Sequence, residues 1–343
     1  MINIKKRIMS AVMLTVLTAA TLTACKGSTN SGSFKGTSGN YKIGLGQFAQ
    51  HPSLDNCREG FMQGLAELGF VEGKNVTYYY DNAETNGGFA NQIYTSYINN
   101  NFNMMVAIAT PMAQSAYSLA RDKDIPIIYT AITDPIAAEL ANKDGMPVGN
   151  ITGTSDKLPV KEQLELIHSM YPDATKVGIL YTTSEVNSLS SIEEYKKYAT
   201  SYGIEIISKG INDTSDMPLA CDSLLNQVDV VTNVTDNTVV ASLPVLLEKA
   251  NAKNIPVFGS EIEQVKMGCI ACMGLDYLEL GKQTARMAAK ILNGEKKASE
   301  MPYEIIENAS LYINEAAANK LNYDLTSKND ILSKATEVFK TIE

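Results

Sequence analysis

The sequence is poor in the residues and motifs on which most catalytic and cofactor sites depend. It contains only two histidines, His51 and His168. This scarcity argues against a zinc site and against a histidine-dependent hydrolase. No GxSxG, P-loop or GxGxxG segment occurs either. We therefore predict that the protein is not an enzyme and binds no cofactor.

Basic patches and long apolar runs are also scarce. Lys and Arg number 29 against 38 Asp and Glu, the formal net charge is -9, and no dense Lys/Arg patch interrupts the acidic balance. Such a balance argues against nucleic acid as a partner. The apolar stretch at residues 8–23 is too short and too rich in Thr and Ala for a comfortable membrane span.

That stretch belongs to a distinct N-terminal segment. Lys5, Lys6 and Arg7 precede it, and it ends in Leu22-Thr23-Ala24-Cys25, which resembles the bacterial lipobox. The Gly/Ser/Thr/Asn-rich residues that follow have little to bury. We predict a lipoprotein signal peptide at residues 1–24, lipidation of Cys25 and a flexible tether at 25–40. The folded part of the protein would then be attached to the extracytoplasmic face of a bacterial membrane only through its lipid anchor.

The other four cysteines show no spacing that identifies a disulfide. Cys269 and Cys272 form a CxxC pair, but they lie in an apolar run with strand character, where residues three apart point to opposite faces. There is no second CxxC and no nearby histidine. We predict structural burial for this pair and no metal site.

From residue 41 onward, predicted strands and helices alternate, and the alternation starts again after residues 149–156. Such a pattern predicts parallel sheets with right-handed crossovers. The fold class is α/β, with two doubly wound parallel-sheet lobes joined by a three-strand hinge. We place lobe I at 41–153 and 277–298, lobe II at 154–276 and 299–325, and a C-terminal helix at 326–343.

Polar residues follow several of the predicted strands. Thr110 and Thr133-Asp134 stand at strand ends in the first series, and Asn187-Ser188 and Asp236-Asn237 do so in the second. Ligands of parallel sheets bind at this edge, beside helix N-termini. The two sets would face each other across a cleft. Helix capping and strand termination remain the alternative for each residue.

Short motifs at these and other strand ends occur in one order between residues 41 and about 322. They comprise Gln47 with His51-Pro52-Ser53-Leu54-Asp55, and residues 73–76, 81–83, 109–114, 133–135, 150–156, 185–188, 236–237 and 274–277. The ordered set resembles the extracytoplasmic substrate-binding lipoproteins of ABC importers, of the tryptophan/tyrosine-binding type, which have a type I periplasmic-binding-protein fold.

The resemblance implies two lobes that close over a small molecule. It places ligand-binding residues in the first lobe (Gln47, Thr110, Thr133, Asp134), at the hinge (Ser155, Asp156), in the second lobe (Asn187, Ser188, Asp236, Asn237, Glu261) and at the return crossing (Asp276). It also implies a separate permease and a cytoplasmic ATPase as partners. We expect the binding protein to be a monomer.

A zwitterionic amino acid would suit such a cleft. Its ammonium needs acceptors, which Asp134, Asp156 and Asp236 could supply, and its carboxylate needs donors, for which neutral groups are available and no Arg. We propose Thr110, Ser155, Asn187 and Ser188 as those donors. Phe48, Tyr181 and Tyr277 are candidate aromatic walls, and His51 is either a donor to the ligand or part of an entry turn.

The prediction is a lipid-anchored binder of an aromatic amino acid (tyrosine, tryptophan or phenylalanine) that delivers it to an ABC importer. Three alternatives remain open at this stage. A protein of this fold could be a surface adhesin. It could bind a different solute, such as a branched amino acid, a nucleoside or a sugar, or it could be an enzyme with an active site on the same architecture.

Overall fold

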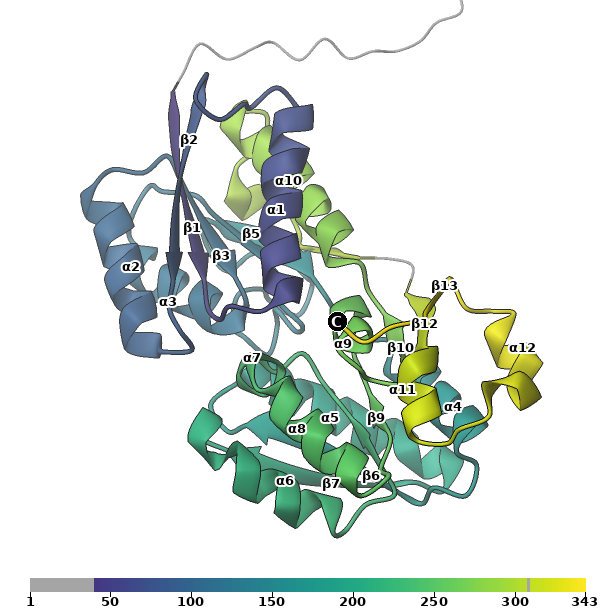
Figure 1. Ribbon diagram of the computed structural model, residues 1–343. Helices are drawn as coiled ribbons and strands as arrows, with labels where there is room; N and C mark the ends of the chain where they lie inside the picture. The colour runs from purple at the N-terminus through teal and green to yellow at the C-terminus, as the bar shows by residue number, and fades with distance from the viewer. Residues whose placement is uncertain (1–39, 307–308) are drawn as a thin grey trace, which may run out of the picture. The chain divides into compact units, whose positions relative to one another are not determined.

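The computed structural model describes residues 40–306 and 309–343 (Figure 1). The predicted signal peptide, Cys25 and all of the predicted tether except Asn40 lie outside the described residues. Within the described part of the chain, no helix is long and apolar enough to cross a membrane.

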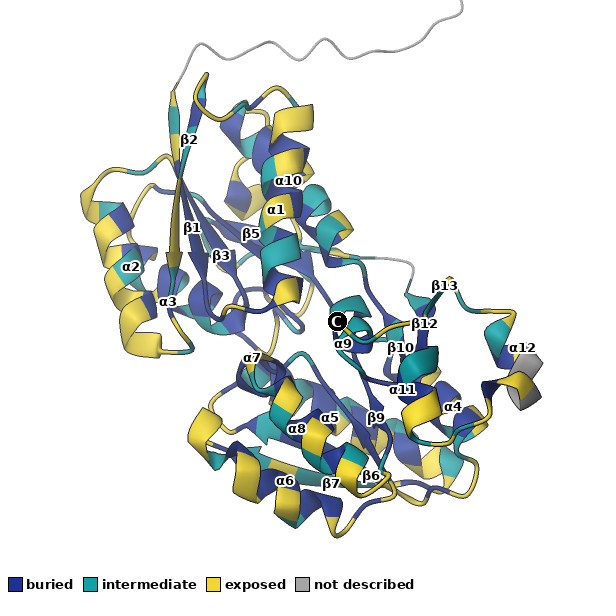
Figure 2. Ribbon diagram, in the orientation of Figure 1, coloured by how far each residue is buried: buried dark blue, intermediate teal, exposed yellow. Residues whose placement is uncertain are grey.

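A six-stranded parallel sheet organises the first lobe, in the order β11-β5-β4-β3-β1-β2. Its strands are β1 (Tyr41–Gln47), β2 (Val76–Asn82), β3 (Met104–Ile108), β4 (Ile127–Thr130), β5 (Ile151–Ser155) and β11 (Glu304–Ile305). Four helices cover it: α1 (Pro52–Glu67), α2 (Gly87–Asn99), α3 (Thr110–Ala120) and α10 (Tyr277–Leu292). Every residue of β3 is buried, because helices lie on both faces of the sheet (Figure 2).

Helices α1 and α10 pack closely because glycines face each other at their contact. A Cβ on Gly60 would collide with the carbonyl oxygen of Leu278, and a Cβ on Gly281 would collide with that of Cys57. This backbone-to-backbone approach brings the first turns of both helices to the same edge of the sheet.

The second lobe is built on a four-stranded parallel sheet in the order β7-β6-β8-β9. These strands are β6 (Lys176–Thr182), β7 (Glu205–Ile211), β8 (Val230–Thr232) and β9 (Val257–Phe258). Its helices are α4 (Val160–Met170), α5 (Val186–Ala199), α6 (Met217–Leu225), α7 (Asn237–Ala241), α8 (Leu243–Ala252) and α9 (Ile262–Lys266).

Three further strands extend this lobe. Backbone hydrogen bonds from Gly259 to Ala271 and from Ile270 to Val257 link β9 to β10 (Ala271–Gly274). Strand β12 (Ser310–Asn314) pairs antiparallel with β10, and β13 (Glu337–Phe339) pairs parallel with β12. Helices α11 (Glu315–Lys320) and α12 (Asn329–Leu332) complete the lobe.

The predicted fold class is confirmed: two helix-covered parallel sheets follow each other, and the chain passes between the lobes after β5, after β10 and after β11. The predicted burial of the CxxC pair is also confirmed, since Cys269 and Cys272 are fully buried free thiols.

Three sequence-based assignments are wrong. The predicted C-terminal helix at 326–343 is a short helix, α12, followed by strand β13, because Tyr312, Ile313 and Asn314 offer an unpaired edge to the chain end. Residues 304–305, assigned to lobe II, form β11 in the sheet of the first lobe, where they pair with β5. Asn187 and Ser188, predicted to stand at a strand end, lie instead in the first turn of helix α5, which begins at Val186.

Candidate functional site

A small cavity lies between the two lobes, at the carboxyl ends of their parallel strands. The first lobe lines it with His51, Ser53, Leu54, Ala131, Asp156 and Tyr277, and the second with Thr235, Asn237, Val240, Glu261 and Gln264. These residues come from the first turns of α1, α7, α9 and α10 and from the segments after β4, β5 and β8. This is the edge at which parallel α/β sheets bind ligands.

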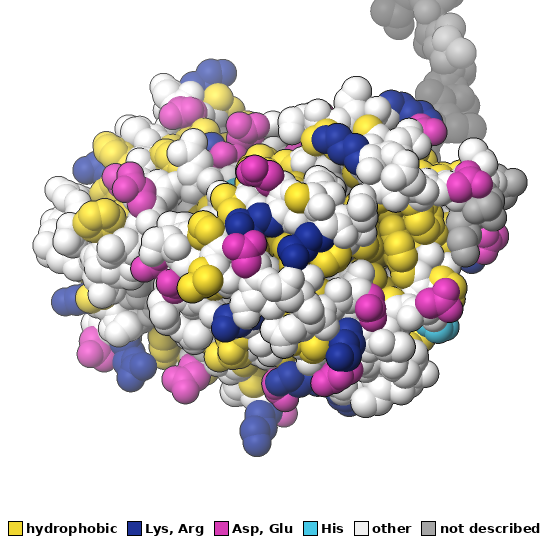
Figure 3. Space-filling model, turned by 60° about the horizontal axis from the view of Figure 1, so that its bottom comes forward, with side chains coloured by type: hydrophobic (Ala, Val, Ile, Leu, Met, Phe, Trp, Pro, Cys, Tyr) yellow, Lys and Arg dark blue, Asp and Glu magenta, His cyan; other side chains and the backbone are white. Residues whose placement is uncertain are grey.

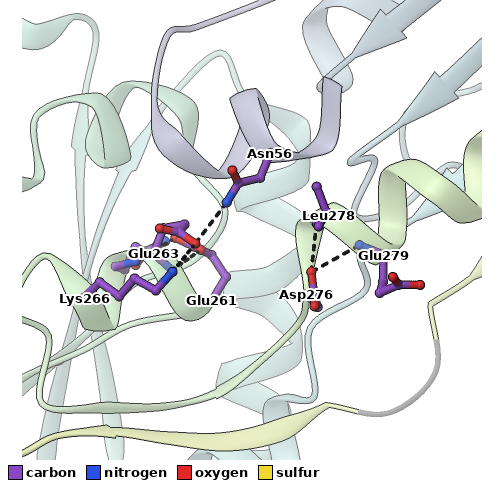
Figure 4. A network of polar contacts seen from close by, with 8 residues as sticks. Asn56, Glu261, Glu263, Lys266, Asp276, Leu278 and Glu279 are labelled. Carbon is purple, nitrogen blue, oxygen red and sulfur yellow. Dashed lines mark hydrogen bonds and ion pairs between the residues drawn. The ribbon is translucent and has the colours of Figure 1, made fainter. Parts of the chain in front are cut away.

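Hydrogen bonds across the cleft hold the lobes together. The hydroxyl groups of Thr133 and Thr235 are 2.8 Å apart, and the Ser190 hydroxyl donates to Asp134 at 2.5 Å. On the other side of the cavity, Asn56 of α1 donates to Glu263 of α9 at 2.9 Å (Figure 4). Between these contacts, the cavity has only about 10 Å³ of space for the centre of a water molecule, which is near the minimum for one water. The cleft is therefore closed.

Asp156 is the acidic group that the first lobe presents to the cavity. It follows β5 and is 1 % exposed. One carboxylate oxygen, Oδ2, accepts a hydrogen bond from the Tyr277 hydroxyl, while Oδ1 has no partner among the described residues. Burial raises the pKa of Asp156, and the hydrogen bond from Tyr277 opposes that shift. A buried carboxylate with a free oxygen is suited to accept a cationic or hydrogen-bonding ligand group.

His51 and Ser53 flank the beginning of α1. His51 occupies the N-cap position, but its side chain caps no N–H group, and Pro52 follows it in the first turn. Neither ring nitrogen of His51 makes a well-aligned hydrogen bond, although the Asn237 side chain lies beside the ring. The Ser53 hydroxyl makes none either, although it lies beside Glu261. Burial lowers the pKa of His51 to about 4, although the charge of Asp55 and the nearby Asn237 side chain oppose this. His51 is therefore a neutral imidazole at physiological pH.

The second lobe holds its corresponding carboxylate very differently. Asp236 is fully buried and caps α7. Its two oxygens accept hydrogen bonds from the backbone N–H and hydroxyl of Thr182, from the Ser188 hydroxyl and from the backbone N–H of Val239, at 2.6–3.0 Å. Asp236 does not line the cavity. It joins β6, α5 and α7 inside the lobe.

Glu185 is a functional candidate that the sequence did not single out. It is 2 % exposed and accepts hydrogen bonds from Asn187, Asn237 and Thr238, the shortest being 2.6 Å from Nδ2 of Asn237. Burial and the charge of Asp236 raise its pKa to about 8, and its hydrogen bonds with Asn237 and Asn187 limit the shift. Glu185 thereby fixes Asn237, which lines the cavity. Its place in the 185–188 motif, directly before a helix, was the available signal.

Glu261 is the second carboxylate that lines the cavity. It caps α9 by accepting hydrogen bonds from the backbone N–H groups of Glu263 and Gln264. Burial raises its pKa to about 7, opposed by the backbone hydrogen bond from Glu263 and by the nearby Ser53 hydroxyl. Both of its oxygens are thus occupied by the helix that it caps.

Two alanines at this edge have strained backbone conformations. Ala109 follows β3 with φ 85°, and Ala131 follows β4 with φ 58°. Residues with a Cβ rarely adopt positive φ, and such strain concentrates at ligand sites, where the surrounding structure enforces it. Ala131 itself lines the cavity.

The predicted site residues fall into three groups. Asp156, Asn237, Glu261 and Tyr277 line the cavity. Thr133, Asp134 and Ser155 line a separate hollow at the rim of the cleft. The structure places Gln47, Phe48, Thr110, Asn187, Ser188, Asp236 and Asp276 outside the cavity lining.

The residues outside the lining have visible structural roles. Gln47 bonds to Ala49, Asp55 and Arg58 within the first lobe, and Phe48 belongs to the core of that lobe. Asp276 caps α10, as Figure 4 shows. Tyr181, a candidate aromatic wall, packs against the core of the second lobe.

Six lining residues were not predicted as ligand contacts: Ser53, Leu54, Ala131, Thr235, Val240 and Gln264. Ser53 and Leu54 lie in the HPSLD motif, and Thr235 directly precedes Asp236, so these motifs reach the cavity through residues other than the predicted ones. The lining also contains two carboxylates and no Lys or Arg. On the face shown in Figure 3, basic and acidic side chains are interspersed.

Residues 42–339 match the family described as ABC transporter substrate binding protein. The chain belongs to this family. It is 35% identical over 331 residues, covering 95% of both chains, to a protein of Clostridioides difficile named tyrosine-binding protein. As an ABC transporter substrate-binding protein, it acts on the extracytoplasmic side of the membrane and has the periplasmic-binding-protein fold.

Two solved structures of similar sequence identity differ in how well they superpose on this substrate-binding protein. The first is an ABC domain from Streptococcus pneumonia in complex with L-Trp, 32% identical, with a TM-score of 0.83 over 88% of this chain and 100% of that one. The second is a ligand-free, open substrate-binding protein with adhesive properties from Clostridium difficile, 35% identical, with a TM-score of 0.65 over 88% and 99%. The better match to the ligand-bound structure agrees with the closed cleft.

Proposed function

We propose that this substrate-binding protein captures an aromatic amino acid between its lobes and delivers it to an ABC permease driven by a cytoplasmic ATPase. The observation that carries the proposal is the composition of the cavity. Its carboxylates, with no Lys or Arg among the lining residues, suit an ammonium group, and Leu54, Ala131, Val240 and Tyr277 suit an apolar side chain. The names of the relatives, tyrosine-binding and L-Trp-bound, select an aromatic amino acid.

Capture requires a cycle of opening and closing. A cavity that holds about one water cannot admit an amino acid, so the lobes must separate before the ligand enters. The ligand then favours the closed state by contacting both lobes. The predicted membrane attachment through lipidated Cys25 and the expected monomeric state belong to this proposal, because they place one binding unit beside the permease.

Isothermal titration calorimetry tests the proposal directly. Purified protein is titrated with L-tyrosine, L-tryptophan and L-phenylalanine, and in parallel with L-leucine, adenosine and D-glucose. We expect binding of at least one aromatic amino acid and at least tenfold weaker binding of the other three compounds. Binding of adenosine or D-glucose without any aromatic amino acid would refute the proposed ligand class.

The membrane anchor has its own test. Replacement Cys25→Ser removes the thiol that lipidation requires and should move the protein from the membrane fraction to the soluble extracytoplasmic fraction. Unchanged membrane association of this variant would rule out Cys25 as the anchor.

Adhesion is a second candidate function, because the open structure from Clostridium difficile carries adhesive properties in its description. Adhesion to host-cell material by a variant that no longer binds any amino acid would separate this function from transport.

A further inference from the structure

Glu185 lies behind the part of the cavity wall that the first turn of α7 forms. It is 2 % exposed and is not among the lining residues. None of the ion pairs within the part of the chain that the structure describes includes Glu185. A buried carboxylate without a cationic partner lowers stability, and buried groups with a shifted pKa are concentrated at functional sites. The hydrogen bonds of Glu185 show what its carboxylate does.

The shortest of these hydrogen bonds fixes the orientation of the Asn237 side chain. An asparagine amide has a donor end and an acceptor end of nearly the same shape. In Asn237 the donor, Nδ2, lies 2.6 Å from Oε2 of Glu185. If the amide were turned round, Oδ1 of Asn237 would face Oε2, and two acceptors would oppose each other.

This orientation does not depend on the protonation state of Glu185. The backbone N–H of Asn237 and Nδ2 of Asn187 also donate to Oε2, each at 3.1 Å. A proton on Oε2 would point at these donors, so a protonated Glu185 would carry its proton on Oε1. Oε2 therefore remains an acceptor for Nδ2 of Asn237 even though burial raises the pKa of Glu185.

The cavity side of Asn237 gives a second indication of the same orientation. The Asn237 side chain lies beside the His51 ring of the first lobe and opposes the lowering of the His51 pKa by burial. A hydrogen bond raises the pKa of a histidine when the partner accepts from a ring N–H, because such a partner favours the protonated ring. The group that Asn237 turns to His51 is therefore its carbonyl oxygen.

We propose that Glu185 is a positioning residue for ligand binding: it holds the amide of Asn237 with Oδ1 toward the cavity, so that this part of the second lobe offers the ligand an acceptor and not a donor. Glu185 acts through Asn237 and does not touch the ligand. The inference rests on the proposed function for the identity of the ligand, whereas the geometry of the pair lies wholly within the second lobe.

A double-mutant cycle measured by calorimetry with L-tyrosine tests this role. Glu185→Ala and Asn237→Ala should each weaken binding about tenfold, and the double variant should bind no more weakly than either single variant, because both changes remove the same interaction. Glu185→Gln, whose side-chain oxygen can still accept from Nδ2 of Asn237, should weaken binding less than threefold. The control is Asp229→Ala, which removes a carboxylate that accepts hydrogen bonds from Thr175 and Lys176 in the same lobe, outside the cavity lining. It should bind L-tyrosine as the wild type does.

Nuclear magnetic resonance of the ligand-free protein gives a readout that a purely structural role would not change. The side-chain amide signal of Asn237, assigned by its absence in Asn237→Ala, should be shifted downfield and protected from exchange in the wild type and in Glu185→Gln. Both properties should be lost in Glu185→Ala. If Glu185→Ala does not fold, Glu185→Asp replaces it in both experiments, because it keeps the charge but is one methylene group shorter.

Two results would overturn the proposal: additive losses of affinity in the double variant, or an unchanged Asn237 amide signal after the loss of Glu185. A wild type that binds no aromatic amino acid, together with a changed amide signal in Glu185→Ala, would refute the proposed function and still support the positioning of Asn237 by Glu185.

Discussion

The polar edges of the two lobes look alike in sequence, yet they differ in how their hydrogen bonds are satisfied. In the first lobe, Asp156 has one free oxygen, and His51 and Ser53 have no partners. In the second lobe, Asp236 accepts hydrogen bonds from Thr182, Ser188 and Val239. We therefore expect a carboxylate after a strand to contact the ligand only where its own lobe leaves an oxygen unsatisfied.

This difference suggests that the two lobes have different roles in binding. The hydrogen bonds of Asp236 and Glu185 connect β6, α5 and α7, so we expect the cleft edge of the second lobe to close over the ligand as a rigid unit. The first lobe instead keeps unsatisfied polar atoms and two strained alanines, which lower stability but favour a ligand. The following predictions test this contrast.

The largest effect is expected for Asp236→Ala. It leaves the N–H groups of Thr182 and Val239 and the Ser188 hydroxyl buried without their acceptor, and hydrogen bonds to a charged group contribute about 1.5–3 kcal/mol each. We expect a loss of about 3 kcal/mol or more in the free energy of unfolding, measured by urea denaturation.

The matched control for this variant is Asp276→Ala. Asp276 also caps a helix, but it is half-buried and binds only the N–H groups of Leu278 and Glu279. Losing such a cap costs about 1 kcal/mol. Equal losses in the two variants would show that the second lobe does not depend on a saturated carboxylate.

A smaller effect is expected for the contact that joins the lobes at the rim. Ser190→Ala removes the donor to Asp134 across the cleft, a half-buried hydrogen bond for which we expect about 1 kcal/mol. Since this bond exists only in the closed state, the dissociation constant for the amino acid should rise up to about fivefold. Ser191→Ala is the control, because its hydroxyl donates to Asn187 within the same helix. Small-angle scattering should show a larger radius of gyration for ligand-free Ser190→Ala; an unchanged radius and affinity would contradict the role.

Much of the fold could be predicted from the sequence, since alternating strands and helices leave a periodic signal. The end of the chain could not. Residues 337–339 form a strand only because they pair with the free edge of β12. Local sequence propensity contains no information about a pairing partner elsewhere in the chain. The sequence also did not show that Glu185 directly precedes a helix, because α5 begins at Val186, before the residues that were predicted to stand at a strand end.

The cavity lies at the sheet edge that the sequence predicts, but only some of the predicted side chains line it. Thr235 and Asp236 are adjacent, yet Thr235 lines the cavity while Asp236 points into its own lobe. The direction of a side chain after a strand depends on the turn and on the donors around it, and sequence spacing shows neither. The sequence pointed to Asp156 because it belongs to the motif at residues 150–156. That one of its oxygens lacks a hydrogen bond can be seen only in the structure.

The last prediction concerns Glu261, the acid that lines the cavity from the second lobe. Its pKa is raised to about 7 by burial, above the value near 4.5 that it has when unfolded, so the folded protein holds a proton that the unfolded chain has lost between these pH values. This stabilisation is present at low pH and is lost as pH rises through 7. We expect Glu261 to account for a fall of about 1 kcal/mol in unfolding free energy between pH 6 and 8.

Two other buried groups also make the unfolding free energy depend on pH in this range. The lowered pKa of His51, about 4, makes the stability rise with pH, whereas the raised pKa of Glu185 makes it fall. The contribution of Glu261 is therefore measured as the difference between the wild type and Glu261→Gln. The variant keeps both other groups and an oxygen to cap α9, and its urea denaturation should show a pH dependence weaker by that amount. Identical slopes for the two proteins would mean that Glu261 stays ionised, in which case the second lobe would also present a charged carboxylate to the ligand.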